Sequence, residues 1–249
     1  MKTICVIPAR YASTRFPGKP LADINGKSMI ERVYNQACAV VNIDEVIVAT
    51  DDQRIEDVVR GFNGKVIMTD AALPSGTDRV YQAVKNISAD VVVNLQGDEP
   101  FVKAQLLESL VKVFENKDIE IATPVSKIYD NREFENPNIV KVVKDINGFA
   151  LYFSRSQIPF LRDLKEPDIT GKQNIYKHIG IYAYRKECLK KLTELKESSL
   201  EKSEKLEQLR FLENGYKLFT VLTDYKSISV DTPEDLEKIK QMIKNNELD

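Results

Sequence analysis

The sequence predicts an α/β protein with a doubly wound, mostly parallel sheet and a mixed, β-rich subdomain. Over residues 1–120, short apolar runs alternate with segments of helical spacing, which is typical of a parallel sheet whose strands are joined by helices. After residue 120, strand patterns follow one another with less regular helical spacing, which indicates a partly antiparallel section. The chain has 249 residues, 43% of them hydrophobic, enough for one domain with a substantial core.

Strand and helix patterns alternate from the first residues. We expect strands over 3–9, 45–50, 65–70 and 90–97, and helices over 29–40, 53–62, 76–87 and 103–116. In open parallel sheets, ligands bind beyond the carboxyl ends of the strands. The residues that follow these strands are therefore the first candidates for a functional site.

The second part of the chain is richer in strand patterns. We expect strands over 119–128, 139–145, 149–155, 178–185, 218–224 and 227–230, and helices over 187–197, 204–215 and 232–246. There is no internal repeat and no low-complexity linker. We therefore expect a single domain over 1–249, with a core formed by 1–120 and 217–249 and a grafted section over 121–216.

Charge and cysteine usage narrow the class of protein. The formal net charge is −2, so the chain lacks the global basic footprint of a nucleic-acid binder. Three widely spaced cysteines, Cys5, Cys38 and Cys188, indicate buried thiols in a reducing compartment, and no Cys/His spacing indicates zinc. The first apolar run is too short for a signal peptide or a membrane span. We expect a cytoplasmic protein with no membrane or nucleic-acid partner.

Positive charge gathers in one loop directly after the first strand. RYASTRFPGK, residues 10–19, carries Arg10, Arg15 and Lys19. It has neither the GxxxxGK[ST] of a P-loop nor GxGxxG, but its small residues Ala12, Ser13 and Thr14 would let backbone amides approach phosphate oxygens. Three cations roughly match a nucleoside triphosphate. The alternative is a basic loop that is simply solvated.

Two carboxylates follow other strand patterns. Asp98 comes directly after the run VVVNLQG, and Asp231 comes after SISV. Mg²⁺ prefers oxygen ligands and usually takes one or two carboxylates together with phosphates, so both are candidate ligands. Alternatively, Asp98 caps the next helix, and Asp231 only precedes a helix start at Thr232 that has proline in its first turn.

Short motifs in a fixed order span almost the whole chain: PARYASTRFPGKPL, SGTDR, NLQGDEP, ALYFSR, HIGIY, LEQLR and VDTPEDL. This ordered set closely resembles the 3-deoxy-manno-octulosonate cytidylyltransferases. The resemblance implies a Rossmann-like nucleotidyltransferase sheet. It also implies that CTP and an eight-carbon 2-keto sugar acid give a CMP-sugar and pyrophosphate, which activates the sugar for lipopolysaccharide synthesis.

The resemblance also implies roles for individual residues. Arg10, Arg15 and Lys19 would hold the triphosphate, and Asp98 and Asp231 would hold Mg²⁺. The CTP site would be lined by Pro8, Ala9, Arg10, Ser75, Gly76 and Arg79, with Arg79 as a long donor to cytidine. Ser75 can equally be the N-cap of a helix.

The sugar acid needs partners for a carboxylate and several hydroxyls. The family pattern implies Gln96, Arg155, His178, Tyr182, Glu207 and Gln208. From the residues alone, His178 and Tyr182 can be structural, and Glu207 and Gln208 can face water on an amphipathic helix. The resemblance further implies a homodimer built on the 121–216 section.

Other functions fit parts of the pattern. Sugar-1-phosphate pyrophosphorylases have a glycine-richer loop in place of ARYASTR, and acylneuraminate cytidylyltransferases share the IPAR start without STRFPGKP. A nucleotide-sensing module would need the cationic loop but not both Asp98 and Asp231. An 8-amino analogue of the sugar acid also remains a possible substrate.

Overall fold

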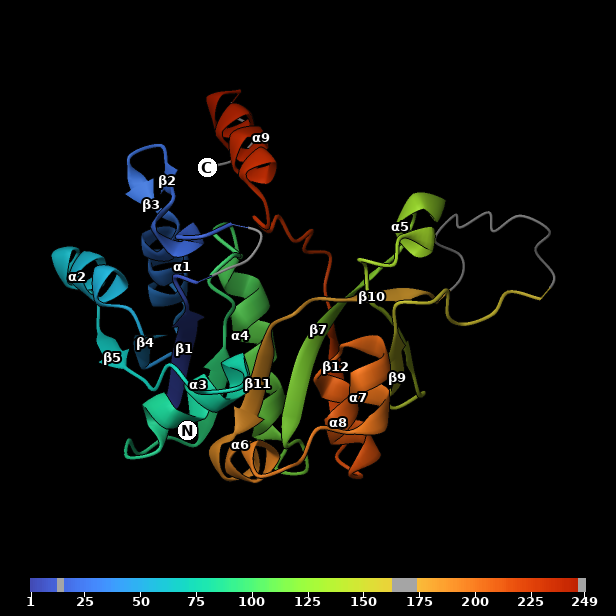
Figure 1. The fold of residues 1–249 in the computed structure, drawn as a ribbon. Coiled ribbons are helices and arrows are strands. Elements are labelled where there is room, and N and C mark those ends of the chain that lie inside the picture. Colours follow the sequence, from blue (N-terminus) through green and yellow to red (C-terminus); the bar gives the residue numbers. More distant parts are fainter. Residues whose placement is uncertain (13–15, 163–173, 246–249) are drawn as a thin grey trace. The chain divides into compact units, whose positions relative to one another are not determined.

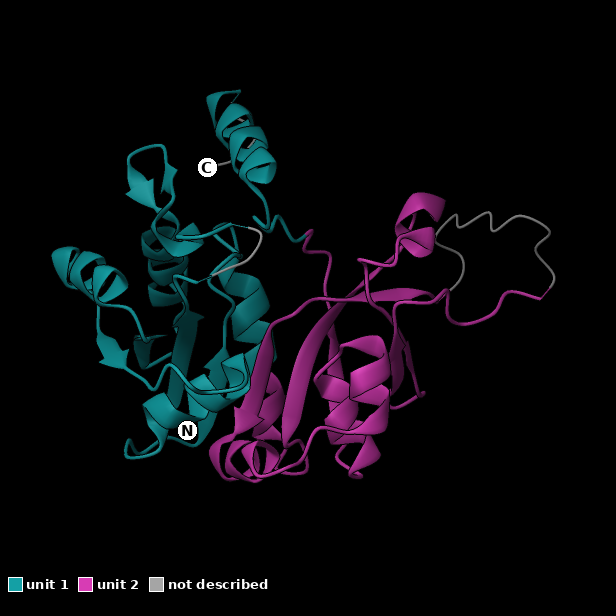
Figure 2. Ribbon diagram, viewed as in Figure 1, with its two compact units in different colours: residues 1–111, 227–249 teal, residues 112–226 magenta. Residues whose placement is uncertain are grey.

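The computed structural model describes residues 1–12, 16–162 and 174–245. The chain forms two compact units (Figure 2). Unit 1 comprises residues 1–111 and 227–249, and unit 2 comprises residues 112–226. The two are described separately below.

Unit 1 is built on a parallel sheet. Its strands are β1 (Thr3–Ala9), β4 (Glu45–Thr50), β5 (Val66–Met68) and β6 (Val91–Asn94), in the order β5-β4-β1-β6. Each pairing between these neighbours is parallel. The central strand β1 is almost wholly buried, as expected of a strand covered on both faces. The parallel α/β core is therefore confirmed.

Five helices among the described residues accompany the sheet of unit 1 (Figure 1). They are α1 (Met29–Cys38), α2 (Gln53–Gly61), α3 (Gly76–Val84), α4 (Ala104–Lys112, which reaches the boundary of the unit) and α9 (Pro233–Lys244). Of these, α1, α2 and α3 connect the strands of the sheet. A short 3-10 helix, Lys19–Leu21, precedes a hairpin of β2 (Asp23–Ile24) and β3 (Lys27–Ser28). Ser28, Asp52, Ser75 and Thr232 cap helices, which fixes where these helices begin.

Unit 2 is organised around one long strand, β7 (Ile121–Lys127). It pairs antiparallel with β10 (Tyr176–His178) and β11 (Tyr182–Arg185), and parallel with β12 (Leu218–Leu222). β8 (Lys141–Lys144) pairs with β10, and β9 (Ala150–Ser154) pairs with β8. The short helices are α5 (Asn131–Glu135), α6 (Lys186–Thr193), α7 (Ser199–Glu204) and α8 (Gln208–Glu213), and a 3-10 turn spans Val113–Glu115. The expected mixed section is confirmed.

Three expected elements are wrong in detail. Residues 227–230 form no strand. The helix expected over 204–215 is α8 alone, because α7 ends at Glu204 and Lys205 turns into the left-handed region, with φ 54°. The strand expected over 178–185 is divided into β10 and β11, since Ile181 N–H bonds back to Ile179 O at 2.7 Å.

The cysteines only partly match the expectation of buried thiols. Cys5 and Cys188 are buried, and burial raises the pKa of the Cys188 thiol to about 12. Cys38 is exposed, because it lies on the outer face of α1 at the last helical residue. All three are free thiols. Within the described residues, no helix has the length and apolar character needed to cross a bilayer.

Candidate functional site

A cleft of about 330 Å³ lies in unit 1, beyond the carboxyl ends of β1 and β6 and beside the first residues of α3. This is where open parallel sheets place their ligands. Predicted residues that line the cleft are Pro8, Ala9, Arg10, Lys19, Gly76, Arg79, Gln96 and Asp98. Ala12 from the cationic loop also lines it, together with Pro20 and Gly97, which the sequence reasoning did not single out.

Lys19 lies between the two predicted metal ligands. Its Nζ donates to Asp98 Oδ2 at 2.8 Å and lies 3.4 Å from Asp231 Oδ1. The three residues are far apart in the sequence: 79 positions separate Lys19 from Asp98, and 212 separate it from Asp231. The structure therefore joins the cationic loop and both carboxylates in one cluster. The solvated-loop alternative does not hold for Lys19, whose side chain is only 17% exposed.

Main-chain contacts explain why the carboxylates meet. Val230 N–H donates to Asp98 O at 3.1 Å, which brings the segment before α9 to the end of β6. Thr232 and Asp235 then form a capping box, with Pro233 at the first helical position. The expected helix start is confirmed. Asp231 directly precedes it and also belongs to the Lys19 cluster. Asp98 is not a helix cap, since α4 begins only at Ala104.

The Lys19 cluster fits a divalent cation that is shared with a ligand. Among the described residues, no group of three or more His, Cys, Asp or Glu side chains is placed to hold a metal ion. Asp98 and Asp231 offer two carboxylates that converge on one positive group. That is the donor set that Mg²⁺ uses when phosphate and water oxygens supply the rest of its coordination sphere.

Contacts within the loop and with neighbouring segments hold the described part of the cationic loop in place. Gly18 N–H donates to Tyr11 O at 2.9 Å, and the Arg54 guanidinium lies 3.3 Å from the centre of the Tyr11 ring. Arg10 Nη2 donates to Leu73 O at 2.5 Å, which holds its side chain at the cleft. Arg15, with Ser13 and Thr14, lies outside the described residues.

The SGTDR segment forms the start of α3. Ser75 is its N-cap: Oγ accepts from Asp78 N–H at 3.1 Å, which confirms the capping interpretation. Gly76 lines the cleft. Gly97, which follows β6 and also lines the cleft, packs closely against β1: a Cβ there would lie only 3.2 Å from Pro8 O, so a side chain would crowd the backbone.

Arg79 is placed differently from the expected free donor. It is fully buried; its Nη2 donates to Asp51 Oδ2 at 2.7 Å and its Nη1 bonds the Thr69 hydroxyl. Burial lowers the pKa of the guanidinium, against the opposing effect of Asp51. Two of its nitrogens are thus committed to the protein, while Nε has no partner among the described residues. Asp51 was missed, although its place directly after β4 is the same signal that identified Asp98.

In unit 2, His178 makes the contacts of a structural residue, which is one of the two roles that the sequence left open. Its Nε2 lies 2.8 Å from Thr123 Oγ1, and its ring packs against Phe153 and Tyr182 at centroid distances of 5.1 and 5.3 Å. The Thr123 hydroxyl donates its one proton to a main-chain carbonyl, Ile181 O at 2.8 Å, so Nε2 is the protonated ring nitrogen. Burial lowers the pKa of His178 to about 3. The imidazole is therefore neutral, and Nδ1 carries a lone pair.

Tyr182 lies on β11, and Glu207 and Gln208 are adjacent residues at the start of α8. Burial, and secondarily the charge of Glu207, raise the pKa of the Tyr182 phenol well above its usual value. Glu207 is half-buried immediately before α8, and Gln208 is only 4% exposed. The alternative in which Gln208 faces water is therefore wrong. It assumed one continuous helix over 204–215, but the chain breaks at Lys205 and α8 starts afresh at Gln208.

Arg155 follows β9 and is held by main-chain carbonyls. Its Nε donates to Glu204 O at 2.9 Å and its Nη1 to Pro137 O at 3.0 Å. Glu204 and Lys141, which surround it, were not identified from the sequence. A carboxylate at the last residue of a short helix and a lysine within a strand gave no signal that could have marked them.

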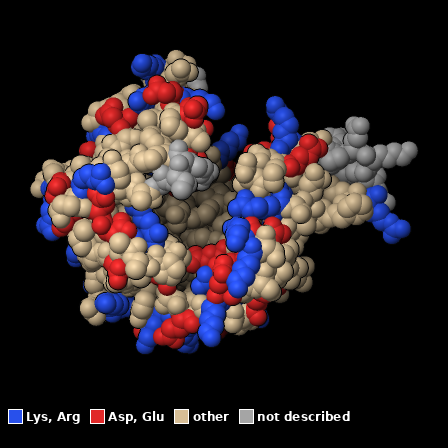
Figure 3. All heavy atoms as spheres, viewed as in Figure 1, with Lys and Arg blue, Asp and Glu red and all other residues tan. Residues whose placement is uncertain are grey.

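On the face drawn in Figure 3, lysine and arginine side chains are interspersed with aspartate and glutamate. Over the whole chain the formal net charge is −2.

The comparisons with known proteins show the family to which the chain belongs. A family model described as cytidylyltransferase matches residues 4–228. A relative from Parabacteroides distasonis, named 3-deoxy-manno-octulosonate cytidylyltransferase, is 50% identical over 98% of this chain and 99% of its own length. One of the same name from Thermodesulfovibrio yellowstonii is 51% identical, over 95% and 96%. A solved structure described as CMP:2-keto-3-deoxy-manno-octonic acid synthetase complexed with CTP is 42% identical, covers 99% of this chain and 100% of that chain, and has a TM-score of 0.92. The chain therefore belongs to the nucleotidyltransferases, and among them to the 3-deoxy-manno-octulosonate cytidylyltransferase family.

Proposed function

We propose that the protein transfers the cytidylyl group of CTP to 3-deoxy-manno-octulosonate, releasing pyrophosphate. The observation that carries this proposal is the Lys19 cluster, in which one ammonium and two carboxylates meet beside a cleft at the ends of β1 and β6. Relatives named for this reaction at about 50% identity over nearly their whole length support it.

The reaction is a displacement at phosphorus. The anomeric hydroxyl oxygen of the sugar acid forms a bond to the α-phosphorus while the bond from that phosphorus to the bridging oxygen breaks. Pyrophosphate leaves with the bonding electron pair, and the hydroxyl proton is lost. The protein contributes positioning and neutralisation of charge, as in other phosphoryl-type transfers.

Lys19 and Arg10 neutralise the triphosphate in this proposal. Lys19 is already placed between two carboxylates, so an incoming phosphate oxygen joins an organised set of charges. Asp98 and Asp231 would hold Mg²⁺, which supplies Lewis-acid neutralisation of phosphate charge when it is bound. The buried Arg79–Asp51 pair fixes the wall of the cleft at α3, where the cytidine would lie.

In our proposal, each of two parts of the chain binds a different substrate. Residues 1–120 and 217–249 would bind the nucleotide, and the 121–216 section would supply the partners for the sugar acid and the contact between subunits. The neutral His178, with its lone pair at Nδ1, suits a sugar hydroxyl as donor. The 8-amino analogue of the sugar acid is the second candidate substrate.

Assembly and location complete the proposal. Unit 2 exposes large apolar side chains, among them Leu151 at 62% and Phe160 at 86%. Leu151 lies on β9, the last strand in the order of the unit 2 sheet among the described residues. We assign this surface to a homodimer contact. The free thiols fit a cytoplasmic enzyme of lipopolysaccharide precursor synthesis.

A two-substrate assay tests the activity. Pyrophosphate should appear only when CTP, 3-deoxy-manno-octulosonate and Mg²⁺ are all present. Equal release with ATP, or release without any sugar acid, would contradict the proposal. Release with a sugar 1-phosphate instead would identify a pyrophosphorylase, and CTP binding without any release would identify a sensing module. A panel of acid sugars that includes the 8-amino form then fixes the acceptor.

A further inference from the structure

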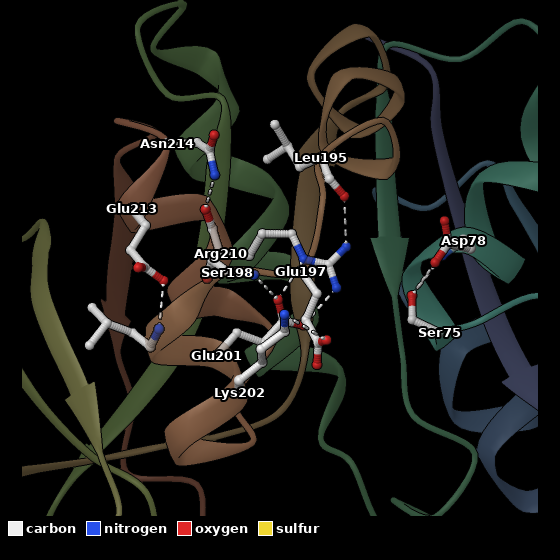
Figure 4. A network of polar contacts seen from close by, with 11 residues as sticks. Ser75, Asp78, Leu195, Glu197, Ser198, Glu201, Lys202, Arg210, Glu213 and Asn214 are labelled. Carbon is white, nitrogen blue, oxygen red and sulfur yellow. Dashed lines mark hydrogen bonds and ion pairs between the residues drawn. The ribbon is translucent and has the colours of Figure 1, made fainter.

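Arg155 stands out among the charged groups of unit 2 because its guanidinium has no carboxylate partner among the described residues. Within the described part of the chain, its side chain donates only to the main-chain carbonyls of Glu204 and Pro137. By contrast, Arg210 forms an ion pair with Glu201, with Nη2 to Oε1 at 2.6 Å (Figure 4). An arginine that is oriented by carbonyls keeps its charge available for an anion.

A buried lysine holds the backbone of Arg155. Lys141 is fully buried, and its ammonium donates to Arg155 O at 2.6 Å, Ile139 O at 2.7 Å and Asn136 O at 2.9 Å. An ammonium has three protons, so all of them are used. The other two carbonyls, those of Asn136 and Ile139, belong to the loop that contains Pro137, and the Pro137 carbonyl accepts from the Arg155 side chain. Lys141 therefore fixes both the backbone of Arg155 and the loop that aims its guanidinium.

Glu204 holds the other side of the same residue. Its Oε2 accepts from Arg155 N–H at 2.9 Å, its Oε1 accepts from Ser154 Oγ at 2.5 Å, and its main-chain oxygen accepts from Arg155 Nε. Lys141 and Arg155 contribute two positive charges and Glu204 one negative charge, so the group has a net charge of +1. A net positive, pre-oriented group favours an anionic ligand.

We propose that Lys141 and Glu204 are positioning residues that fix Arg155 to bind the carboxylate of the sugar acid. This inference rests on the proposed function for the identity of the anion. Arg155 touches the ligand, and Lys141 and Glu204 act only through it. The cost of ordering a long arginine side chain is met on folding, so less of it remains when the ligand binds.

The test compares substitutions that act on Arg155 with matched substitutions that do not. Glu204→Gln keeps the shape but removes one of the two acceptor oxygens. It should raise the KM for the sugar acid about tenfold, the effect of losing one charge-assisted hydrogen bond, with the KM for CTP unchanged. Glu201→Gln is the control on the same helix, because Glu201 pairs with Arg210 instead. It should lower the Tm and leave the KM for the sugar acid unchanged.

Lys141→Met has its own control in Lys177→Met. Lys177 is opposite Lys141 in the strand register and pairs with Glu133. Lys141→Met should raise the KM for the sugar acid, and Lys177→Met should not. Lys141→Met leaves three carbonyls without a donor, so this variant can fail to fold. The inference is therefore judged on the KM of Glu204→Gln for the sugar acid.

A double-substitution cycle separates positioning from general stability. If Glu204 acts through Arg155, Glu204→Gln should not raise the KM further in an Arg155→Ala background. Equal increases in both backgrounds would overturn the inference, as would a Glu204→Gln protein with a normal KM for the sugar acid. Binding of the sugar acid alone, measured as a shift of the Tm, gives a second readout without turnover. A wild-type protein that releases no pyrophosphate with CTP and the sugar acid would instead refute the proposed function itself.

Discussion

At the scale of single residues, the cations of the site are paired with carboxylates of the protein. Lys19 is flanked by two carboxylates, and Arg79 is buried against Asp51. Each cation is therefore oriented before any ligand arrives, which is the condition under which charge contacts contribute most to a transition state. Removing one member of such a set changes both the remaining charge and the geometry.

Lys19→Ala should keep the fold, because the residue belongs to a short 3-10 turn at the rim of the cleft. Losing its contact to the transition state should reduce kcat/KM by about 10²–10³-fold. Steady-state kinetics on Lys19→Ala and on Lys27→Ala, an exposed lysine in β3, would measure this. Near-normal turnover in Lys19→Ala would restore the solvated-loop interpretation.

Asp231→Asn should weaken the dependence on Mg²⁺ and leave the start of α9 intact. The substitution keeps the shape and removes an anionic ligand, while the capping box of Thr232 and Asp235 is untouched. A titration of activity against Mg²⁺ would show a higher requirement than in Glu234→Gln, an exposed carboxylate in the first turn of α9. Identical titrations would leave Asp98 as the only ligand from the protein.

His178 should make stability depend on pH in a defined window. Its folded pKa of about 3 lies below the ordinary 6.5, so between these values the unfolded imidazole binds a proton that the folded one does not. The contribution of neutral His178 to the free energy of unfolding is therefore complete above pH 6.5. It falls as the pH is lowered towards 3, by up to about 1.4 kcal/mol per pH unit. Urea unfolding at pH 7, 6 and 5 should show this extra slope in the wild type and not in His178→Gln. Parallel curves for the two proteins would mean that His178 does not titrate differently on folding.

At the scale of elements, periodicity identified the parallel core and the helices α6 and α8, but it missed the short helices α5 and α7 of unit 2. The strands β1, β4, β5 and β6 are apolar runs between helical segments, so their type follows from the pattern alone. The break between α7 and α8 depends on Lys205 at φ 54° and ψ 47°, a conformation that lysine rarely adopts and that no residue pattern encodes. The pairing of Arg79 with Asp51 was unpredictable for a related reason, because it depends on tertiary contacts between β4 and α3.

The left-handed residue between α7 and α8 gives an element-scale prediction. Lys205→Gly should raise the free energy of unfolding by about 0.5–1 kcal/mol, because glycine adopts this conformation without steric strain. Lys202→Gly, in the right-handed part of the same helix, should lower it by about 1 kcal/mol. Urea unfolding of both variants would measure the difference, and a destabilised Lys205→Gly would show that the lysine side chain makes a contribution larger than the strain.

At the scale of the whole molecule, the proposed homodimer can be tested directly. Leu151 and Phe160 are too exposed for a monomer to gain stability from them, so burial against a second copy is their expected use. Light scattering should give twice the mass of 28.3 kDa, and Phe160→Asp should give a monomer. An unaltered dimer in Phe160→Asp, or a monomeric wild type, would contradict this assignment. Val41→Asp, at a side chain 92% exposed in unit 1, is the control.

The main-chain bond from Val230 to Asp98 has a consequence for synthesis of the protein. A ribosome that has translated only as far as residue 226 has already made every strand of the β5-β4-β1-β6 sheet. That nascent polypeptide still lacks Asp231, so Lys19 has only Asp98 beside it. The sheet can form before residue 231 is made, but the charge cluster is completed only afterwards. Catalytic competence is therefore acquired only after the strands that carry the cleft have been made.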